Sequence, residues 1–477
     1  MTRLSAVVAA AAIALGACMS PTAGTSTPTP SVVVAPAAVA FDAAKAKAHV
    51  DYLADAARGG RYSGSAGYRD AANYVADRFR EIGLEPLGDN GTFFQHFTMP
   101  IVDLTEMSTL TGPGGQTYRA RVDFTESVGG RSGSGKVEAE IAAIGGAARS
   151  GGQNDFAGAN VRGKIALVTG PAAPNAGSSV ENAYQEGAIG VLVIGDAKLR
   201  YSYVSRFQTE TIPTFVITED VANQLLAPAG KTLASARDLV RARRTNPSAP
   251  ASGFDVPTTV RMRVSLTPVH DVDAMNVVGL LRAPDPNNAQ RAVLVGGHLD
   301  GVGTDPDGSV FQAANDNASG SAMAIEVARA LAASRSSLNH SIVFVAFAGE
   351  EEGYYGSEAY SVQMATIPGR VESLVAMVNL DVVGCCSDTL VISNESPELQ
   401  RRVRDMATSL GTLTEAGSTG GSDQTSFARR RVPAVLIEAA DFILHVYADK
   451  PSVVQESRLK KAGDVVTAVV KDLATAP

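Results

Sequence analysis

Acidic and imidazole side chains recur in this chain directly after apolar runs. Three such runs, RAVLVGG, SIVFVAFAG and LVAMVNL, end at residues 297, 349 and 380, and each is followed by His, Glu or Asp. A fourth run, VPAVLIE, is followed shortly by a histidine, and the segment AANDNASGSAMAIEVARAL places an aspartate just before a helical pattern. The side chains concerned are His298, Asp300, Asp316, Glu350, Glu351, Glu352, Asp381 and His445.

Such a cluster of carboxylates beside imidazoles is unstable unless protons or a cation neutralise it. Taken singly, each residue has an ordinary explanation as a turn residue, a helix cap or a core histidine, but their joint occurrence favours a shared site. Divalent metals bind this set of groups, and no cysteine joins it, which excludes a thiolate-rich structural zinc. Two histidines with several carboxylates suit a pair of metals bridged by a carboxylate and a water.

Strands alternating with helices must position these side chains. Apolar strand patterns occupy 275–281, 291–297, 341–347, 374–380 and 432–438, and helical patterns occupy 318–333, 357–366, 395–410 and 454–473. This alternation predicts an α/β fold with a mostly parallel sheet sandwiched by helices. In such sheets ligands collect beyond the carboxyl ends of the strands, where the charged residues fall. Two further helices are expected at 42–57 and 66–84, the second ended by Gly83.

The amino terminus, MTRLSAVVAAAAIALGAC, has the layout of an export signal and is too short for a stable membrane span. Leu15-Gly16-Ala17-Cys18 resembles a bacterial lipobox, which predicts a signal peptide at 1–17 and a lipidated Cys18. Residues 18–40, rich in Pro, Thr and Ala, then form a flexible tether. We therefore expect an exported protein of the bacterial cell envelope, lipid-anchored in the periplasm or outer membrane. Plain secretion with a chance cysteine is the alternative.

The net charge and the distribution of basic residues exclude some partners. The net charge is -8 and no basic cluster suits nucleic acid, so no nucleic-acid partner is expected, and membrane association is expected only through Cys18. The other two cysteines, Cys385 and Cys386, are adjacent, so a bond between them would be strained and would not be an ordinary structural disulfide.

Together these motifs resemble the M28 family of zinc peptidases, which includes bacterial aminopeptidases. The matching segments are GGHLD (296–300), NDNASG (315–320), AGEEEGYYGS (348–357), NLDVVG (379–384), SDQTSF (422–427) and HVYAD (445–449). A second likeness, to a protease-associated (PA) domain, rests on GKIALVTG, AYQEGAIGVLVIGD and IPTFVIT. The resemblance implies a zinc exopeptidase fold with a β-rich PA insertion. The expected limits are 41–103 for the first peptidase part, 104–256 for the PA domain and 257–477 for the catalytic part.

The resemblance also implies a role for each residue of the site. It implies two zinc ions bridged by Asp316, with His298 and Asp381 on one ion and Glu351 and His445 on the other. Glu350 would be the general base, and it would pass a proton from water to the leaving amine. Asp300 would lie beside His298 and set its tautomer.

Two positions depart from the family pattern. The tyrosine that some relatives carry near the last histidine is absent, because Leu444 precedes His445 and Tyr447 follows it, so the oxyanion donor is unassigned. Gln424 stands where the family usually has histidine in its SDH motif, and no metal role is expected for it.

The predicted function is therefore a zinc-dependent aminopeptidase that hydrolyses N-terminal residues from peptides. We expect it to favour apolar residues at that position. The alternatives are a glutaminyl cyclase-like acyltransferase or an acidic dipeptide carboxypeptidase on the same fold, a non-catalytic receptor-like binding protein, and a structural envelope lipoprotein that stores cations.

Overall fold

The computed structural model describes residues 41–149, 154–171, 178–364, 366–417 and 420–477. The signal peptide, Cys18 and the tether expected at 1–40 lie outside these residues. Within the described ranges no helix combines the length and the apolar character needed to cross a membrane.

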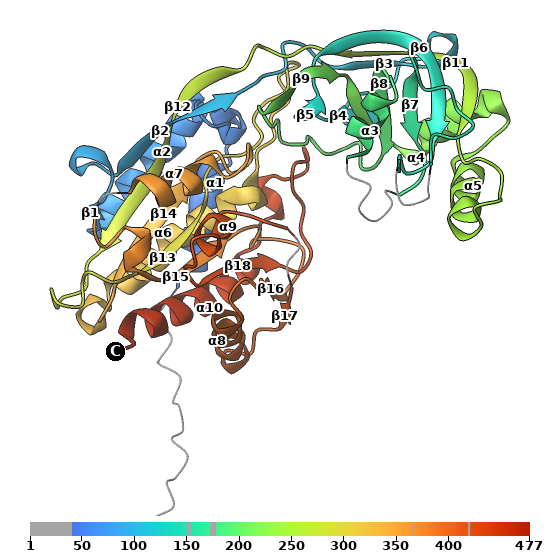
Figure 1. Cartoon of the computed structure of the whole chain (residues 1–477). Helices are drawn as coiled ribbons and strands as arrows, with labels where there is room; N and C mark the ends of the chain where they lie inside the picture. Colours follow the sequence, from blue (N-terminus) through green and yellow to red (C-terminus); the bar gives the residue numbers. More distant parts are fainter. Residues whose placement is uncertain (1–40, 150–153, 172–177, 365, 418–419) are drawn as a thin grey trace, which may run out of the picture. The chain divides into compact units, whose positions relative to one another are not determined.

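Four parallel strands form the centre of the large sheet (Figure 1). In spatial order they are β14 (Ser341–Phe347), β13 (Ala292–His298), β15 (Leu374–Leu380) and β18 (Ala434–Ala439). Antiparallel neighbours flank them: β12 (His270–Leu281) pairs with β14, and β16 (Leu390–Ile392) pairs with β18. The outer strands are β1 (Glu85–Pro86), β2 (Phe94–Ile101) and β17 (Thr414–Ala416). The expected α/β class with a helix-covered sheet is confirmed, and the parallel pairing is concentrated at its centre.

Helices cover both faces of this sheet because its central strands are apolar on both sides. Along β13, Val293 and Val295 enter one hydrophobic core, whereas Leu294 enters the core on the opposite face. The first core contains residues of α1 (Ala43–Leu53), α2 (Ala66–Ile82), α6 (Ser319–Ala332), α8 (Pro397–Ser409) and α10 (Glu456–Thr475). The second contains Tyr360 of α7 (Tyr355–Gln363) and Phe427 of α9 (Gln424–Ala428). Period-two alternation of buried residues therefore joins sheet and helices into three layers.

Helix α2 shows how local sequence fixes an element boundary. The Ser65 side chain accepts a hydrogen bond from the Tyr68 N–H at the first turn, which satisfies one of the unpaired N–H groups there. Gly83 ends the helix in the left-handed conformation at φ 86°, as the sequence predicts.

The segment between β2 and β12 forms a second sheet, with its own core and helices (Figure 1). Its strands, in spatial order, are β3 (Thr109–Thr111), β11 (Phe254–Val264), β6 (Gly135–Ile144), β7 (Ile165–Val168), β8 (Gly190–Ile194), β10 (Thr214–Ile217) and β4 (Phe124–Glu126). A separate pair joins β5 (Gly130–Ser132) to β9 (Phe207–Ile212), and the helices are α3 (Ser179–Gln185), α4 (Glu219–Leu226) and α5 (Leu233–Thr245). Because β11 pairs with β6 as far as Val264, the strand spans the expected boundary at residue 256.

The parallel centre of the large sheet brings the charged motifs to one edge. His298 is the last residue of β13, Asp381 directly follows β15, and Glu350 lies three residues beyond β14. Strands that run in the same direction end at the same edge, so residues far apart in the chain meet there.

Cys385 and Cys386 are joined by a disulfide in the turn after β15. The adjacency argument did not anticipate this bond, which closes a ring between neighbouring residues.

Candidate metal centre

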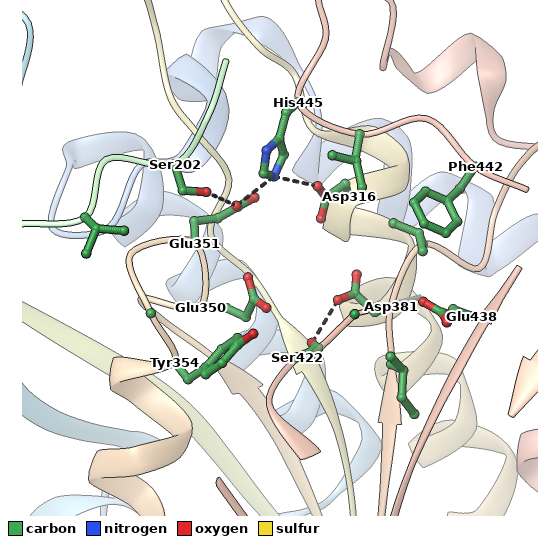
Figure 2. Close-up of a pocket in the computed structure, with 17 residues that line it drawn as sticks. Ser202, Asp316, Glu350, Glu351, Tyr354, Asp381, Ser422, Glu438, Phe442 and His445 are labelled. Atoms are coloured by element: carbon green, nitrogen blue, oxygen red, sulfur yellow. Dashed lines mark hydrogen bonds and ion pairs between the residues drawn. The ribbon is translucent and has the colours of Figure 1, made fainter. Parts of the chain in front are cut away.

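One buried imidazole, His298, and one partly buried imidazole, His445, share one aspartate at the carboxyl edge of the sheet. His298 Nε2 lies 3.3 Å from Asp316 Oδ1, and His445 Nε2 lies 3.1 Å from Asp316 Oδ2. His445 Nε2 is also 2.8 Å from Glu351 Oε2, as drawn in Figure 2. Each oxygen of Asp316 therefore faces a different histidine, which is the arrangement a bridging ligand requires.

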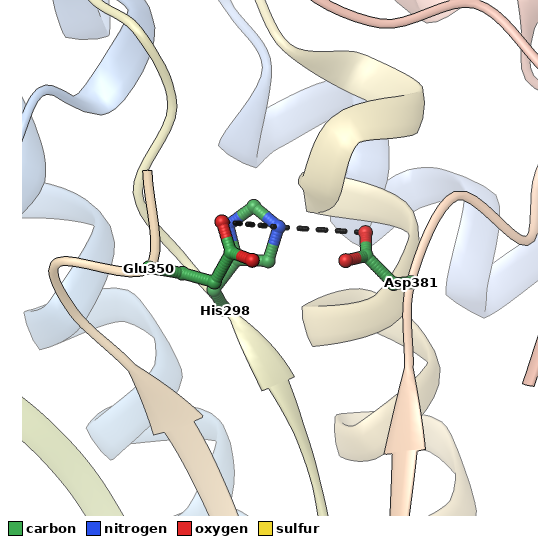
Figure 3. A group of neighbouring side chains, drawn as sticks. All are labelled: His298, Glu350 and Asp381. Carbon is green, nitrogen blue, oxygen red and sulfur yellow. Dashed lines mark ion pairs between the residues drawn. The ribbon is translucent and has the colours of Figure 1, made fainter. Parts of the chain in front are cut away.

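A further carboxylate lies beside His298. Asp381 Oδ1 is 3.4 Å from His298 Nε2, and Glu350 Oε2 is 3.9 Å from the same nitrogen (Figure 3). One ligand atom from each of these three residues falls within 4.8 Å of the others, and His298, Asp316 and Glu351 form a second such group. The structure thus brings together all five residues expected as metal ligands. Glu350, the expected general base, lies in the same cluster.

These spacings fit divalent ions with tetrahedral geometry. Two donors that each lie about 2.0–2.1 Å from a zinc ion at the tetrahedral angle are roughly 3.3 Å apart. The nitrogen–oxygen separations from His298 to Asp316 and Asp381, 3.3 and 3.4 Å, match that edge. In addition, Asp381 Oδ1 and Glu351 Oε1 are buried and have no hydrogen-bond partner among the described residues. Buried oxygens without a partner are costly, and a bound cation would satisfy them.

The electrostatics of the cluster show how strongly the charges depend on one another. Burial alone would lower the pKa of His298, but Asp381 and Glu350 raise it well above its usual value. Burial would raise the pKa of Asp316, but hydrogen bonds from His298 and His445 hold it well below its usual range. For Glu350, burial raises the pKa well above the ordinary value, and the Glu351 and Asp381 carboxylates raise it further. The positive charges of the imidazoles thus offset the carboxylates of the cluster.

Hydrogen bonds between loops hold Asp316 in place. The Asp449 carboxylate accepts the N–H groups of Asn315 at 2.7 Å and Asp316 at 3.0 Å. Burial raises the pKa of Asp449 to about 7, although both of these N–H groups lower it. Asn317 donates its side-chain amide to the Leu380 carbonyl at 2.8 Å, which ties this loop to the end of β15.

The backbone around the centre is held in uncommon conformations. Four non-glycine residues that flank or form the site have positive φ: Ala313 at 52°, Tyr354 at 65°, Val382 at 45° and His445 at 53°. Such conformations cost free energy and persist where the surroundings over-determine them, as they commonly do at functional sites.

Asp300 and Glu352 lie behind the ligand set. The Asp300 carboxylate is 3.6 Å from His298 Nδ1, whereas its main-chain oxygen lies closer, at 3.2 Å, and its Oδ2 accepts the Glu351 N–H at 3.2 Å. Glu352 is buried, and burial together with Asp300 and Glu351 raises its pKa well above the usual value. Asp300 therefore connects the loop of His298 to the loop of Glu351. Glu352 is not among the residues that line the cavity.

The centre opens into a cavity of about 370 Å³. Its apolar lining includes Val204, Val382, Phe442 and Leu444, and its polar lining includes Ser202, whose hydroxyl donates to Glu351 Oε2 at 3.0 Å (Figure 2). Ser202 and Val204 belong to the segment expected as the PA domain. Leu444 lines the cavity, whereas the Tyr447 hydroxyl donates instead to the buried Asp305.

Sequence reasoning missed several residues that organise the site. Ser422 donates to Asp381 Oδ2 at 2.8 Å and accepts from Asn379 at 2.9 Å. Ser422 stands in the SDQ motif and Asp449 ends the HVYAD motif, so these two motifs were the available signals. No motif marked Ser202. Gln424 bonds to Asn379 and Glu395.

Two segments of the chain match known protein families. Residues 276–470 match peptidase family M28, and residues 137–225 match the PA domain. These two matches confirm the resemblance to M28 peptidases and to PA domains that the motifs carry.

Two curated relatives show where the sequence similarity lies. Aminopeptidase YwaD of Bacillus subtilis is 29% identical over 221 residues, which cover 41% of this chain and 44% of that protein. A probable zinc metalloprotease of Pyricularia oryzae is 40% identical over 116 residues, which cover 24% of this chain and 22% of the relative. The matches to such fungal relatives span about a quarter of their length.

Among solved structures, an aminopeptidase from Aneurinibacillus sp. strain AM-1 superposes with a TM-score of 0.67 and 22% identity, covering 92% of this chain and 95% of that one. At this identity the likeness establishes the fold, which therefore extends over both sheets.

Proposed function

We propose that this protein is a zinc-dependent aminopeptidase that hydrolyses the first peptide bond of peptides with a free amino terminus. The observation that carries the proposal is the sharing of Asp316 between two imidazoles, each of which has at least one further carboxylate beside it. The relatives named above, an aminopeptidase and a probable zinc metalloprotease, support the same reaction class.

In this proposal His298, Asp316 and Asp381 would hold one zinc ion, and Asp316, Glu351 and His445 would hold a second. When bound, the ions would polarise the scissile carbonyl and make a water molecule acidic enough to attack near neutral pH. The carboxylate of Asp381 is oriented for this task by the Ser422 hydroxyl.

Glu350 would accept the proton of the attacking water and return it to the leaving amine. The carboxyl lines the cavity and belongs to the buried cluster, so it can reach a substrate that lies over the ligand set. A carboxyl whose pKa is raised by burial holds a proton more readily, as a group that must both accept and return one requires. Asp300 would orient His298 and the Glu351 main chain.

The cavity leaves limited room for the first residue of the substrate. Val382, Phe442 and Leu444 give it an apolar lining, so an uncharged apolar residue fits best. Residues 104–256 would act as a PA domain that contributes to access, because Ser202 and Val204 line the same cavity.

An assay with paired substrates tests this function. The purified chain should release nitroaniline from leucine p-nitroanilide and leave the N-acetylated analogue intact. Exhaustive chelation should abolish the release, and zinc should restore it. Release that persists after chelation would contradict a metal mechanism, and equal turnover of the blocked substrate would contradict an aminopeptidase.

Substitution tests the role of Glu350. Glu350→Gln should lower kcat by about 10²–10⁴-fold, the range for loss of a general base, with unchanged zinc content. Glu398→Gln, at an exposed glutamate of α8, is the matched control and should leave kcat unchanged.

We also propose export to the bacterial envelope with a lipid on Cys18, which rests on the apolar N-terminal run and the Leu-Gly-Ala-Cys sequence. Metabolic labelling with a fatty-acid analogue should mark the wild-type protein and not Cys18→Ala. Equal labelling of both would contradict the anchor.

A further inference from the structure

The hydrogen-bond donors of the cavity are almost all committed to carboxylates. The lining residues with an N–H or O–H in the side chain are Ser202, Tyr354, Ser422 and His445. The two serines donate to Glu351 and Asp381, and His445 lies against Glu351 and Asp316. The Tyr354 hydroxyl, by contrast, has no hydrogen-bond partner within the part of the chain that the structure describes.

Tyr354 is held on the same turn as Glu350. Its N–H donates to the Glu350 carbonyl at 3.1 Å, and the next N–H, of Tyr355, donates to Gly349 at 2.8 Å. Tyr354 also precedes helix α7 with a left-handed backbone, which fixes the direction of its side chain. The turn that carries the proposed base therefore also aims a phenol at the cavity.

The ring fits into the space that Gly421 provides. A Cβ atom at Gly421 would lie only 2.8 Å from the Tyr354 hydroxyl, so any larger residue there would displace it. Figure 2 shows the ring below Glu350, with its hydroxyl end directed toward Ser422. The hydroxyl thus lies in the cavity lining together with Glu350 and Ser422.

The phenol keeps its proton in this setting. Burial raises the pKa of Tyr354 to about 12, and the carboxylates of Glu350, Asp423 and Asp381 contribute to the increase. The group can therefore donate a hydrogen bond at every pH at which a peptidase works, whereas it cannot act as a base.

We infer that Tyr354 is a further catalytic residue, whose hydroxyl donates a hydrogen bond to the substrate oxygen that gains negative charge during attack by water. This inference rests on the proposed aminopeptidase function. It also accounts for Leu444, since leucine beside His445 has no donor to offer. The tyrosine retains its O–H bond throughout, so no proton leaves it and no bond to the substrate forms.

The variant Tyr354→Phe tests the inference, because it removes the hydroxyl and keeps the ring. The kcat for leucine p-nitroanilide should fall by about 10²–10³-fold, the range for loss of one donor to an oxyanion, and KM should change little. Tyr355→Phe is the matched control: Tyr355 lies outside the cavity lining, and its hydroxyl accepts from Arg206 Nε at 3.3 Å. Tyr355→Phe should leave kcat within about twofold of wild type.

Calorimetry of ligand binding gives a second reading that does not depend on turnover. The phosphonate analogue of leucine carries the charged tetrahedral group, whereas leucine carries a planar carboxylate. Tyr354→Phe should weaken phosphonate binding by at least tenfold and leave leucine binding nearly unchanged, at wild-type zinc content.

The outcomes separate this inference from the proposed function. An inactive wild-type protein would contradict the function itself. An active wild type with a Tyr354→Phe variant within threefold in kcat, or with a rise in KM alone, would overturn only the role of Tyr354. Equal weakening of phosphonate and leucine binding would overturn it as well, because the hydroxyl would then serve ground-state binding.

Discussion

Arg61 offers a quantitative test of how the centre is supported. Its side chain is fully buried, and its guanidinium donates four hydrogen bonds of 2.7–2.9 Å to main-chain oxygens. The acceptors are the carbonyls of Leu53, Leu299, Gln312 and Ala313. Leu299 lies between two residues of the site, and Ala313 begins the loop that carries Asp316, so Arg61 connects both loops to the end of α1.

Two opposing effects determine how much Arg61→Met changes the free energy of unfolding. Four hydrogen bonds from a charged group, at about 1.5 kcal/mol each, contribute on the order of 6 kcal/mol. Burial lowers the pKa of Arg61 to about 10, despite the nearby aspartates, which shows that the charge itself is unfavourable there. The decrease from 12.5 corresponds to about 3 kcal/mol, which the neutral methionine would recover. The net loss of unfolding free energy is therefore about 3 kcal/mol, with similar packing volume.

Urea unfolding of the zinc-free chain measures this loss as a shift in midpoint at an unchanged slope. Arg80→Met, at an exposed arginine of α2, is the matched control and should stay within about 0.5 kcal/mol of wild type. Zinc affinity should also fall in Arg61→Met, because the loops of His298 and Asp316 lose their common tie. If Arg61→Met is as stable as Arg80→Met, the hydrogen bonds do not outweigh the buried charge and the reasoning fails.

Three further outcomes are expected. Ser422→Ala removes the hydroxyl that holds Asp381 and should weaken binding of one zinc ion by about 10–100-fold in competition titrations; equal affinity would contradict that role. Asp305→Ala leaves the buried Arg121 guanidinium without its two 2.9 Å bonds and should lower unfolding free energy by about 3–5 kcal/mol, whereas no change would show that the pair is dispensable. Burial, with Arg78 and Lys45 contributing, lowers the pKa of His49 to about 4, so its contribution to stability is complete above about pH 6.5 and is lost between pH 6.5 and 4. In His49→Gln the urea midpoint should therefore change less with pH between 6.5 and 4 than it does in wild type. The same dependence of the midpoint on pH in both proteins would contradict the assignment.

The sequence predicts the central elements closely, because their signals are local. The strands expected at 341–347 and 374–380 are β14 and β15 with the same limits, and α2 ends at Gly83 as expected. Hydrophobic runs between turn residues define such elements without reference to the rest of the chain. The three-residue strands β16 and β17 escaped notice, since they are held by pairing with neighbours and carry little pattern of their own.

The residues of the site also divide into those that the sequence predicts and those that it does not. Histidine, aspartate and glutamate at strand ends are visible as residue types, so His298, Asp316, Glu351, Asp381 and His445 could be predicted to meet, and the structure brings them together. Their supports could not be predicted, because the contacts join distant positions: 133 residues separate the Asp449 carboxylate from the Asp316 N–H that it accepts. Tyr354 was visible beside the glutamates, yet only the set of committed donors in the folded cavity distinguishes it from a packing residue.

The most direct test of the account is the number of zinc ions that the protein binds. Elemental analysis of the zinc-loaded, dialysed chain should give two ions per chain, because Asp316 offers one oxygen to each histidine. Asp316→Ala, which removes the carboxylate shared by the two histidines, should retain fewer than one zinc ion per chain. One ion per chain in the wild type, or two ions retained in Asp316→Ala, would contradict the shared centre on which the proposed chemistry depends.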